Sequence, residues 1–475
     1  MLAKPSLIKI SSSEVLAGLG SKKTVSLESQ YGNGDLIKLL DILGIGRLLQ
    51  VKSPWLLEDD NGKELINAGG YAALPFGEMY PPLLEFIKTY LEQNKNMGLP
   101  QQSASEWRAA LETNLINILA QELPEHADSQ VFFSNSGAEA IEAAIKFAKA
   151  ARRKAKYIVN FSKGYHGKTL GALSLTPNEE YQALFRPLMP GVKTFKYGDS
   201  HYFEKEIKRL GAKNIIAIVL EPIQGEGGVI IPPKDFLPTV NEVAKKHGIV
   251  IIADEIQSGL GRTGHWFASI ANGLEPDIIT LAKPLGGGII PIGATIARKK
   301  IVKKMLGGLE SKRHSNTFGG GSLAMAVGLK SLELIVNEDL VAKAKRDGEK
   351  GLVRLKEIQT KYPGYIKEVR GAGMLFAMQL RHIVKPSISL GQGELVSQLG
   401  TALAMRAFHK HGVHVCFTLN AAQVVRLTPA LNMPEDIFVD LFNKVEQTAK
   451  NNKAAWHMLP KTRADILAKL AKLAL

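Results

Sequence analysis

The stretch Gly248-Ile-Val-Ile-Ile-Ala-Asp-Glu-Ile-Gln257 is an apolar run that ends on acidic side chains, and a second run, Asp277-Ile-Ile-Thr-Leu-Ala-Lys283, follows it along the chain. Short apolar runs of this kind are typical of strands that are buried on both faces of a parallel sheet. If both are strands of one sheet, they bring the carboxylate of Asp254 and the amine of Lys283 to the same C-terminal edge. Open α/β sheets bind their ligands at that edge.

An amine and a carboxylate in this arrangement suit pyridoxal phosphate. The amine can form a Schiff base with the cofactor aldehyde, and the carboxylate can keep the pyridine nitrogen protonated so that the ring works as an electron sink. A buried ion pair at two strand ends explains Lys283 and Asp254 equally well. The glycines at 286–288 indicate a close approach of the backbone to a ligand. The choice between a cofactor site and an ion pair depends on the rest of the chain.

From residue 130 onward, apolar runs alternate with helical patterns. Helices are expected from residue 137 and over 235–247, and strands are expected at 130–134, 157–161, 215–220, 249–253, 277–281 and 292–297. This alternation predicts an α/β fold with a mainly parallel sheet. After about residue 325, long helices precede short alternating strands at 373–380, 413–417 and 424–428, which predicts a smaller α+β domain.

Two domains and an N-terminal segment are expected from these patterns. Residues 1–95 form an N-terminal segment that contributes to the small domain, 96–325 form the large cofactor-binding domain, and 326–475 form the C-terminal small domain. Its tail, 462–475, has the pattern of an amphipathic helix.

Two helix starts are also expected in the N-terminal part of the chain. Residues 35–43 read as an amphipathic helix, and Ser103-x-x-Glu106 reads as a capping box ahead of another helix.

Composition limits the classes of function. The 475 residues carry 60 Lys and Arg against 45 Asp and Glu, a net charge of +15, but the basic residues are spread along the chain without a nucleic-acid-binding signature. No partner nucleic acid is therefore expected. No apolar run is long enough to cross a membrane. Cys416 is the single cysteine, which excludes an internal disulfide and fits a cytoplasmic protein.

Three loops carry further candidate residues. Ser136, Gly137 and Ala138 stand at a strand-to-helix turn, where free amides and the helix dipole bind phosphate, although a helix cap without a ligand has the same pattern. Tyr165 could stack on a flat cofactor ring or simply pack. Glu221 and Glu226 lie in a glycine-rich loop, where paired carboxylates could also bind a metal. No further metal ligands stand nearby, so no metal is expected.

Taken together, these motifs resemble the class III, or ω-type, aminotransferases of the pyridoxal phosphate fold-type I superfamily, over roughly residues 50 to 445. Seven motifs carry the resemblance: Ser134-Asn-Ser-Gly-Ala-Glu-Ala140, Tyr165-His-Gly-Lys-Thr169, Glu221-Pro-Ile-Gln-Gly-Glu-Gly-Gly228, Ala253-Asp-Glu-Ile-Gln-Ser-Gly-Leu-Gly-Arg-Thr-Gly264, Leu281-Ala-Lys-Pro-Leu-Gly-Gly-Gly288, Thr317-Phe-Gly-Gly320 and Val425-Arg-Leu-Thr-Pro-Ala-Leu431. The resemblance implies a large domain with a mainly parallel seven-stranded sheet and a smaller α+β domain.

The resemblance also implies how the cofactor is held. Lys283 forms the Schiff base, Asp254 pairs with the pyridine nitrogen, Gln257 contacts the phenolic oxygen and Tyr165 stacks on the ring. The cofactor site further includes Ser136, Gly137 and Ala138 for the phosphate, Glu221, and Thr317 from a neighbouring subunit. The last of these implies a homodimer. A ping-pong reaction with a small-molecule amine donor and a keto acid acceptor follows.

The substrate class depends on four residues. Arg426 matches the family arginine that binds the carboxylate of glutamate or 2-oxoglutarate, and Glu226 matches the acid that neutralises it when an ω-amine enters. Lys168 replaces an arginine of the ornithine and acetylornithine branches and favours a diamine, and Tyr71 stands before the substrate entrance. The putrescine branch looks closest. The leading hypothesis is transfer of a terminal amine from a putrescine-like or ornithine-like donor to 2-oxoglutarate. The alternative is an ω-aminotransferase for a specialised aldehyde or ketone.

Overall fold

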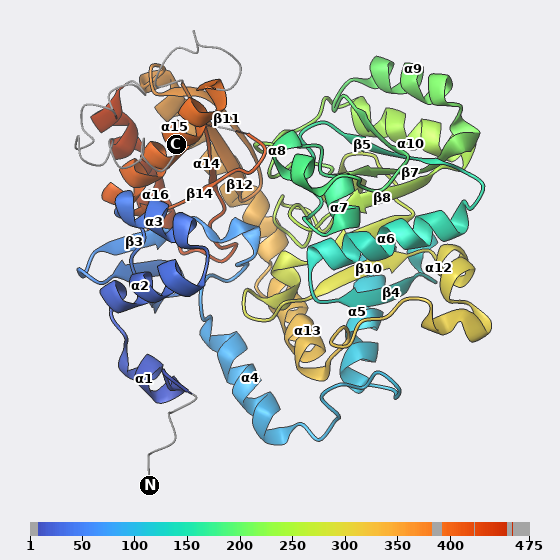
Figure 1. Cartoon of the computed structure of the whole chain (residues 1–475), viewed down its shortest axis with the longest axis horizontal. Coiled ribbons are helices and arrows are strands. Elements are labelled where there is room, and N and C mark those ends of the chain that lie inside the picture. The colour runs from blue at the N-terminus through green and yellow to red at the C-terminus, as the bar shows by residue number, and fades with distance from the viewer. Residues whose placement is uncertain (1–7, 382–391, 422, 454–457, 459–475) are drawn as a thin grey trace.

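The computed structural model describes residues 8–381, 392–421, 423–453 and 458. The larger of its two lobes is built on a seven-stranded sheet (Figure 1). The strand order is β4 (Gln130–Ser134), β10 (Gly293–Ala297), β9 (Ile278–Leu281), β8 (Val250–Asp254), β7 (Ile215–Leu220), β5 (Tyr157–Phe161) and β6 (Val192–Phe195). Only β10 runs against the others, because it pairs antiparallel with both β4 and β9. The predicted mainly parallel sheet is confirmed.

Helices cover both faces of this sheet because its central strands are apolar throughout. Along β7, Ile216 and Val219 pack with helix α6 (Gly137–Ala151), whereas Ile215 and Ile218 pack with the opposite cluster, which includes helix α10 (Phe236–His247). A fully buried side chain of this size contributes about 1.5–3 kcal/mol. The continuous apolar runs of the sequence therefore reflect a sheet buried between two helical layers.

The sequence prediction was wrong in some details of these elements. Helix α5 (Glu106–Glu122) has Ser105, not Ser103, as its N-cap, because the hydroxyl of Ser105 accepts a hydrogen bond from the amide of Arg108. Strand β6 was not predicted, since its sequence Val-Lys-Thr-Phe lacks a continuous apolar run. The predicted end of α10 is confirmed: Gly248 adopts φ +59°, a left-handed conformation that suits glycine.

The smaller lobe contains two four-stranded sheets. One has the order β11 (Ile366–Ala372), β12 (Leu375–Leu380), β15 (Val424–Leu427) and β14 (Cys416–Phe417), all antiparallel. The other has the order β1 (Leu49–Ser53), β2 (Leu56–Asp59), β3 (Glu64–Asn67) and β13 (Val413–His414). Because β13 joins β3, the start of the chain and its last third meet in one sheet. The domain boundaries at residues 95 and 325 stay predictions, and the predicted tail helix, 462–475, lies outside the described residues.

The other helices surround these sheets. The smaller lobe carries α2 (Ser21–Tyr31), α3 (Gly34–Ile42), α14 (Leu340–Lys361), α15 (Gln392–Lys410) and α16 (Glu435–Asn452) (Figure 1). The rest are α1 (Ser12–Ala17), α4 (Pro81–Gln93), α7 (Leu170–Ser174), α8 (Glu179–Gln182), α9 (Ser200–Leu210), α11 (Ala268–Ala271), α12 (Lys299–Leu306) and α13 (Ser322–Asn337). In the part of the chain that the structure describes, none of the helices has the length and apolar character needed to span a membrane.

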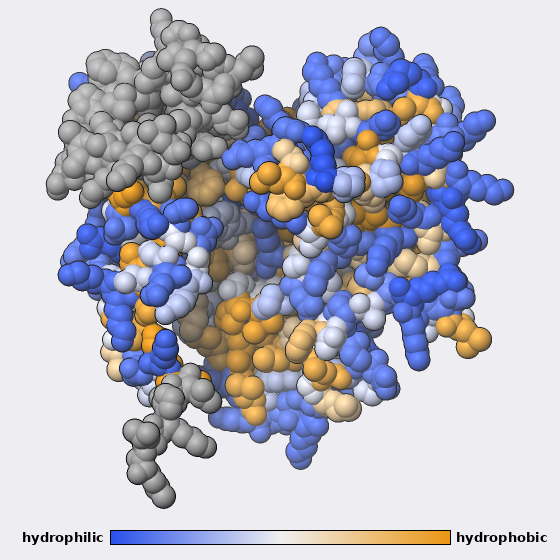
Figure 2. All heavy atoms as spheres, in the orientation of Figure 1, coloured by the Kyte–Doolittle hydropathy of each residue, from blue (hydrophilic) through white to orange (hydrophobic). Residues whose placement is uncertain are grey.

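The surface differs between the outer side of the larger lobe and the region between the lobes. Hydrophilic side chains predominate around α9 and α12, whereas apolar side chains gather beside α4, below the hollow that separates the lobes (Figure 2).

Candidate active site

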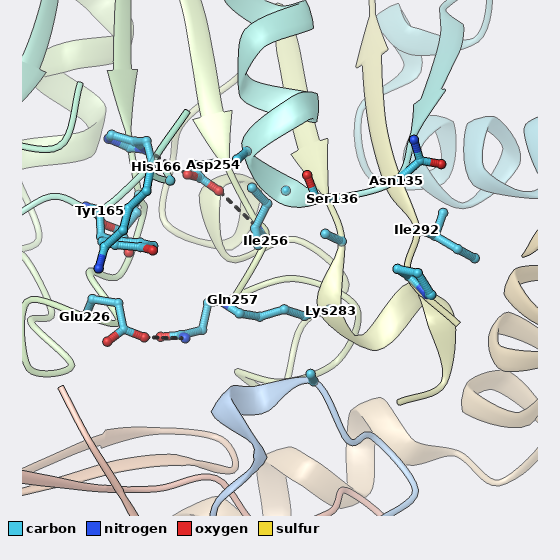
Figure 3. Close-up of a pocket in the computed structure, with 18 of the residues that line it drawn as sticks. Asn135, Ser136, Tyr165, His166, Glu226, Asp254, Ile256, Gln257, Lys283 and Ile292 are labelled. Carbon is cyan, nitrogen blue, oxygen red and sulfur yellow. Dashed lines mark hydrogen bonds and ion pairs between the residues drawn. The ribbon is translucent and has the colours of Figure 1, made fainter. Parts of the chain in front are cut away.

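A cavity of about 460 Å³ lies at the C-terminal edge of the large sheet. The loops that follow β4, β5, β7, β8 and β9 supply most of its lining, as the parallel topology predicts. It brings together ten of the residues predicted from the sequence, namely Ser136, Gly137, Ala138, Tyr165, Lys168, Glu221, Glu226, Asp254, Gln257 and Lys283. Figure 3 shows several of them converging from separate strands.

Asp254 ends β8, and its carboxyl group is buried and hydrogen-bonded on both oxygens. Its Oδ2 lies 2.7 Å from Nδ1 of His166, and its Oδ1 accepts a hydrogen bond from the amide of Ile256 at 3.1 Å. Burial alone lowers the pKa of His166, but the hydrogen bond and charge of Asp254 outweigh it, so that the pKa is raised. The sequence analysis missed His166, although it stands next to Tyr165 in the motif Tyr-His-Gly-Lys-Thr. Its partnership with Asp254 depends on two loops that are far apart in sequence.

Lys283 follows β9 and lies half-buried in the cavity wall. It begins a short 3₁₀ turn, Lys283–Gly286, with a positive φ of 37°. Burial lowers the pKa of its amine, an effect that the carboxylates of Glu226 and Asp254 partly oppose. A lysine in this environment gives up its proton more easily than one in water, which makes it a better nucleophile and base.

The glycines after Lys283 permit close packing around it. Gly288 has φ +81°, a left-handed conformation that favours glycine, and a Cβ there would lie 2.6 Å from Cδ2 of Leu74, so that side chain would have to move.

The N-terminus of α6 borders the opposite end of the cavity. The hydroxyl of Ser136 accepts a hydrogen bond from the amide of Glu139 at 3.2 Å, and the Glu139 carboxylate accepts one from the amide of Asn135 at 2.6 Å. A Cβ on Gly137 would lie only 2.8 Å from Ile256, so glycine is needed for this close approach. The positive end of a fifteen-residue helix and its first amides thus border the cavity, a combination that suits phosphate.

Glu221 connects two loops of the site. Its Oε1 accepts a hydrogen bond from the amide of Tyr165 at 2.8 Å, and its Oε2 accepts one from the amide of Gly225 at 2.9 Å. Burial raises the pKa of Glu221 to about 7. Since both carboxylate oxygens bind backbone amides, Glu221 orients the aromatic wall at Tyr165 and the loop that carries Glu226.

Glu226, Gln257 and Arg426 form a buried polar cluster beside Lys283. Nη1 of Arg426 donates to Oε1 of Glu226 at 2.6 Å and to Oε1 of Gln257 at 3.0 Å, and Nε2 of Gln257 donates to Glu226 at 3.3 Å (Figure 3 shows the last contact). Burial raises the pKa of Glu226, but the charges of Arg426 and Lys283 outweigh it and lower the pKa. Nε and Nη2 of Arg426 have no hydrogen-bond partner within the described residues. One side of this fully buried guanidinium is therefore without a described acceptor.

Three other predicted residues lie outside the cavity lining. Tyr71, with a positive φ of 53°, places its ring centroid 5.7 Å from Cζ of Arg426, and burial raises the pKa of its hydroxyl to about 12. Thr317 is exposed, and its carbonyl accepts a hydrogen bond from Gln101. Arg426 lies behind Glu226 and Gln257.

Lys168 is exposed at the edge of the cavity. Its Nζ stands 4.1 Å from the ring centroid of Tyr181, so the ammonium lies over an aromatic face.

This donor set fits pyridoxal phosphate. It offers an amine that faces the cavity, a buried carboxyl group with a histidine partner, the aromatic ring of Tyr165 and a helix N-terminus. Among the residues that the structure describes, no group of three or more His, Cys, Asp or Glu side chains is arranged to hold a metal ion.

Comparisons with known proteins agree with this arrangement. Residues 50–448 match the family model described as aminotransferase class-III. The putrescine aminotransferase of Pectobacterium atrosepticum is 35% identical over 392 residues, which cover 82% of this chain and 79% of the relative. The aminotransferase PigE of a Serratia species is 31% identical over 466 residues. That match covers 89% of this chain but only 53% of PigE, so the chain spans about half the length of that relative.

Solved structures show the same fold. An amine transaminase from an uncultivated Pseudomonas species, in its PLP-bound form, superposes with a TM-score of 0.75 and 26% identity, covering 85% of this chain and 95% of the other. The ornithine aminotransferase of Toxoplasma gondii superposes with a TM-score of 0.73 and 25% identity, covering 85% and 90%. The predicted fold-type I architecture is confirmed.

Proposed function

Because the chain belongs to the class III aminotransferase family, we propose that it transfers the terminal amino group of a diamine or ω-amino acid to 2-oxoglutarate. One observation carries the proposal: Arg426 is fully buried, pairs with Glu226 through Nη1 only, and keeps Nε and Nη2 free among the described residues. Its relatives named putrescine aminotransferase and ornithine aminotransferase support the same class of donor.

Pyridoxal phosphate is the cofactor, since membership of this family confirms the prediction made from the sequence. When bound, it supplies an electron sink for the carbon that carries the transferred amine. Ser136, Gly137 and Ala138 would hold its phosphate, Tyr165 would cover its ring, and Asp254 would pair with its ring nitrogen.

Lys283 performs the proton transfer in this proposal. With the cofactor and donor bound, its free amine would act as a base that takes the proton from the carbon bearing the donor amine and gives it back later in the same transfer. Burial lowers the pKa of the amine, which favours the neutral form that the step requires. His166 keeps the carboxyl group of Asp254 oriented through their hydrogen bond.

Glu226 and Arg426 allow one site to bind two kinds of substrate. A keto acid brings a carboxylate, for which the planar guanidinium of Arg426 offers two parallel donors. A diamine brings no carboxylate at that end, and Glu226 then remains the partner of Arg426. The buried charge of Arg426 is balanced in both half-reactions, which avoids the penalty for an unpaired buried ion.

The donor is identified by following the absorption of the holoenzyme during single-turnover mixing with putrescine, longer diamines, ornithine and glutamate. Conversion by a diamine or ornithine supports the proposal, and no conversion by any of them rejects it. Conversion by glutamate alone would favour the alternative function, amination of a specialised aldehyde or ketone, which the similarity to PigE supports. Lys168, a cation at the edge of the cavity, is the residue to replace first when donor length is examined.

We further propose a cytoplasmic homodimer in which the partner subunit's Thr317 completes the phosphate site. The exposed position of Thr317, outside the cavity of its own chain, supports this arrangement. Mixed dimers of Lys283→Ala and Thr317→Ala chains test it. If threonine acts across the interface, one of the two sites in each mixed dimer is intact and activity returns. If it acts within its own chain, both sites carry a lesion and the mixture stays inactive.

A further inference from the structure

Arg262 is a fully buried arginine for which the reaction has no assigned use. It lies in the loop after β8, within the motif that begins at Ala253. It forms no ion pair with any residue that the structure describes, and its Nε and Nη2 are without hydrogen-bond partners there. Burial lowers its pKa to about 9, so the guanidinium remains charged at neutral pH. A buried charge without a carboxylate destabilises a fold, so stability alone does not explain Arg262.

The contacts of Arg262 join the two lobes. Its Nη1 donates to the carbonyl of Met374 at 3.0 Å and to the carbonyl of Pro429 at 2.6 Å. In return, the amide of Met374 donates to the backbone carbonyl of Arg262 at 2.9 Å. Met374 lies in the turn between β11 and β12, and Pro429 lies just after β15. One side chain thus ties the loop after β8 to two segments of the smaller lobe.

Glycines allow the backbones to pack closely where the loop after β8 meets the smaller lobe. A Cβ on Gly373 would lie 2.6 Å from the amide nitrogen of Gly264 and 2.7 Å from the carbonyl oxygen of Arg262. Gly348, on α14, packs in turn against the backbone of Gly373. The three backbone segments are in direct contact, so neither lobe can shift here without breaking the hydrogen bonds of Arg262.

The segments that Arg262 joins also carry the proposed carboxylate site. Gln257 precedes Arg262 in the same loop, and Arg426 precedes Pro429 by three residues; the two are hydrogen-bonded to each other. Thr428 extends the connection toward Tyr71. Its amide donates to the carbonyl of Ala68 at 2.8 Å, its hydroxyl donates to the carbonyl of Gly69, and the same hydroxyl accepts a hydrogen bond from the amide of Ala72 at 3.3 Å.

We propose that Arg262 is a positioning residue for the keto acid half-reaction: by holding Pro429 it places Arg426 and Tyr71 against Gln257. Arg262 itself touches neither cavity nor substrate. The inference rests on the proposed function, in which the free side of Arg426 binds the carboxylate of the acceptor. Because the rate depends on how the bound substrate is aligned, a displacement of Arg426 by about 1 Å is enough to lower the rate of this half-reaction about a hundredfold.

The test measures the two half-reactions of the holoenzyme separately, with 2-oxoglutarate and with putrescine, for Arg262→Met and Arg262→Lys. Methionine keeps an apolar stem without the charge, and lysine keeps the charge without the planar fork. We expect the KM for 2-oxoglutarate to rise at least tenfold in Arg262→Met and less in Arg262→Lys. The rate and KM with putrescine, which has no carboxylate, should stay within twofold.

Arg152→Met is the matched control. Arg152 also binds backbone carbonyls, through Nε to Ile215 at 2.8 Å, but at the start of β7 and away from the cavity. The Arg152→Met variant should have a lower melting temperature but an unchanged KM for 2-oxoglutarate. If both Arg262 variants behave like this control, Arg262 is only structural and the inference is overturned.

Arg426→Gln separates the inference from the function on which it rests. If Arg426→Gln raises the KM for 2-oxoglutarate and the Arg262 variants do not, the inference alone fails. If Arg426→Gln leaves that KM unchanged, the proposed carboxylate site is wrong and the inference falls with it.

Discussion

Lys283 shows how the surroundings of a single side chain prepare it for chemistry. It lies half-buried at the end of an apolar strand, and burial disfavours its charged form, while Glu226 and Asp254 oppose that effect from the other side of the cavity. The balance leaves an amine that can both attack a carbonyl and accept a proton.

Replacement of Lys283 by alanine should therefore remove the group that bonds to the cofactor and moves the proton. We expect the donor half-reaction to slow about a thousandfold. Borohydride reduction followed by peptide mapping should find no cofactor adduct. Lys168→Ala, which removes another lysine of the same cavity, is the control and should keep the adduct. An adduct at any other lysine in the wild-type protein would contradict the assignment.

Glu226→Gln tests the paired charges. The amide keeps the size of the side chain but no longer neutralises Arg426, so the donor half-reaction must proceed beside an unpaired buried cation. We expect the KM for the amine donor to rise roughly tenfold, equivalent to about 1.4 kcal/mol, while the KM for 2-oxoglutarate stays level or falls. Steady-state kinetics with each substrate varied would reveal it. Parallel increases in both constants would mean that the pair is merely structural.

At the scale of elements, helix α6 serves the sheet and the site at once. Its apolar face packs on β7 and β9, while its N-terminus borders the cavity through Ser136. The helix cap and the proposed phosphate site are thus the same turn of the chain.

Ser136→Ala should accordingly have two effects. Loss of the cap lowers the free energy of unfolding by about 1 kcal/mol, and the affinity for pyridoxal phosphate falls as well. Ser105→Ala provides the comparison, because Ser105 caps α5 through the same kind of hydrogen bond but does not line the cavity. Denaturant unfolding and cofactor titration of both variants should give similar stability losses but a weaker cofactor affinity only for Ser136→Ala.

For the whole molecule, Glu221 links stability to pH. Its pKa is raised to about 7, whereas the ordinary value is 4.5. Below pH 4.5 the group is protonated in both the folded and the unfolded chain. As the pH rises, the unfolded chain loses this proton first, so the stability associated with protonated Glu221 is lost as the pH passes through 7.

Between pH 4.5 and pH 8, the contribution of Glu221 should lower the free energy of unfolding by on the order of 3 kcal/mol. Glu221→Gln stays neutral and should lack this contribution. The measurement compares the free energies of unfolding of the two cofactor-free proteins across that range. Their difference should change by about 3 kcal/mol, and parallel pH profiles would contradict the prediction.

Patterns in the sequence predict the family, six of the seven strands of the large sheet and the chemistry that we expect at its edge. Those features depend on short-range patterns: apolar runs that predict strands, and the glycine-rich motifs that follow them around Asp254 and Lys283. The cap of α5 at Ser105 was not predicted, because the nearby Ser103 offers the same hydrogen-bonding group.

The contacts between residues that are far apart in the sequence follow from the tertiary structure alone. Glu226 and Arg426 are 200 positions apart, His166 reaches Asp254 from another strand, and Arg262 joins segments of both lobes. No local pattern encodes these contacts, because each depends on the packing of whole strands and lobes, which sets the position of every side chain at the sheet edge. The proposed role of Lys283 can thus be predicted from a local sequence motif. The residues proposed to select the substrate come together only in the folded chain.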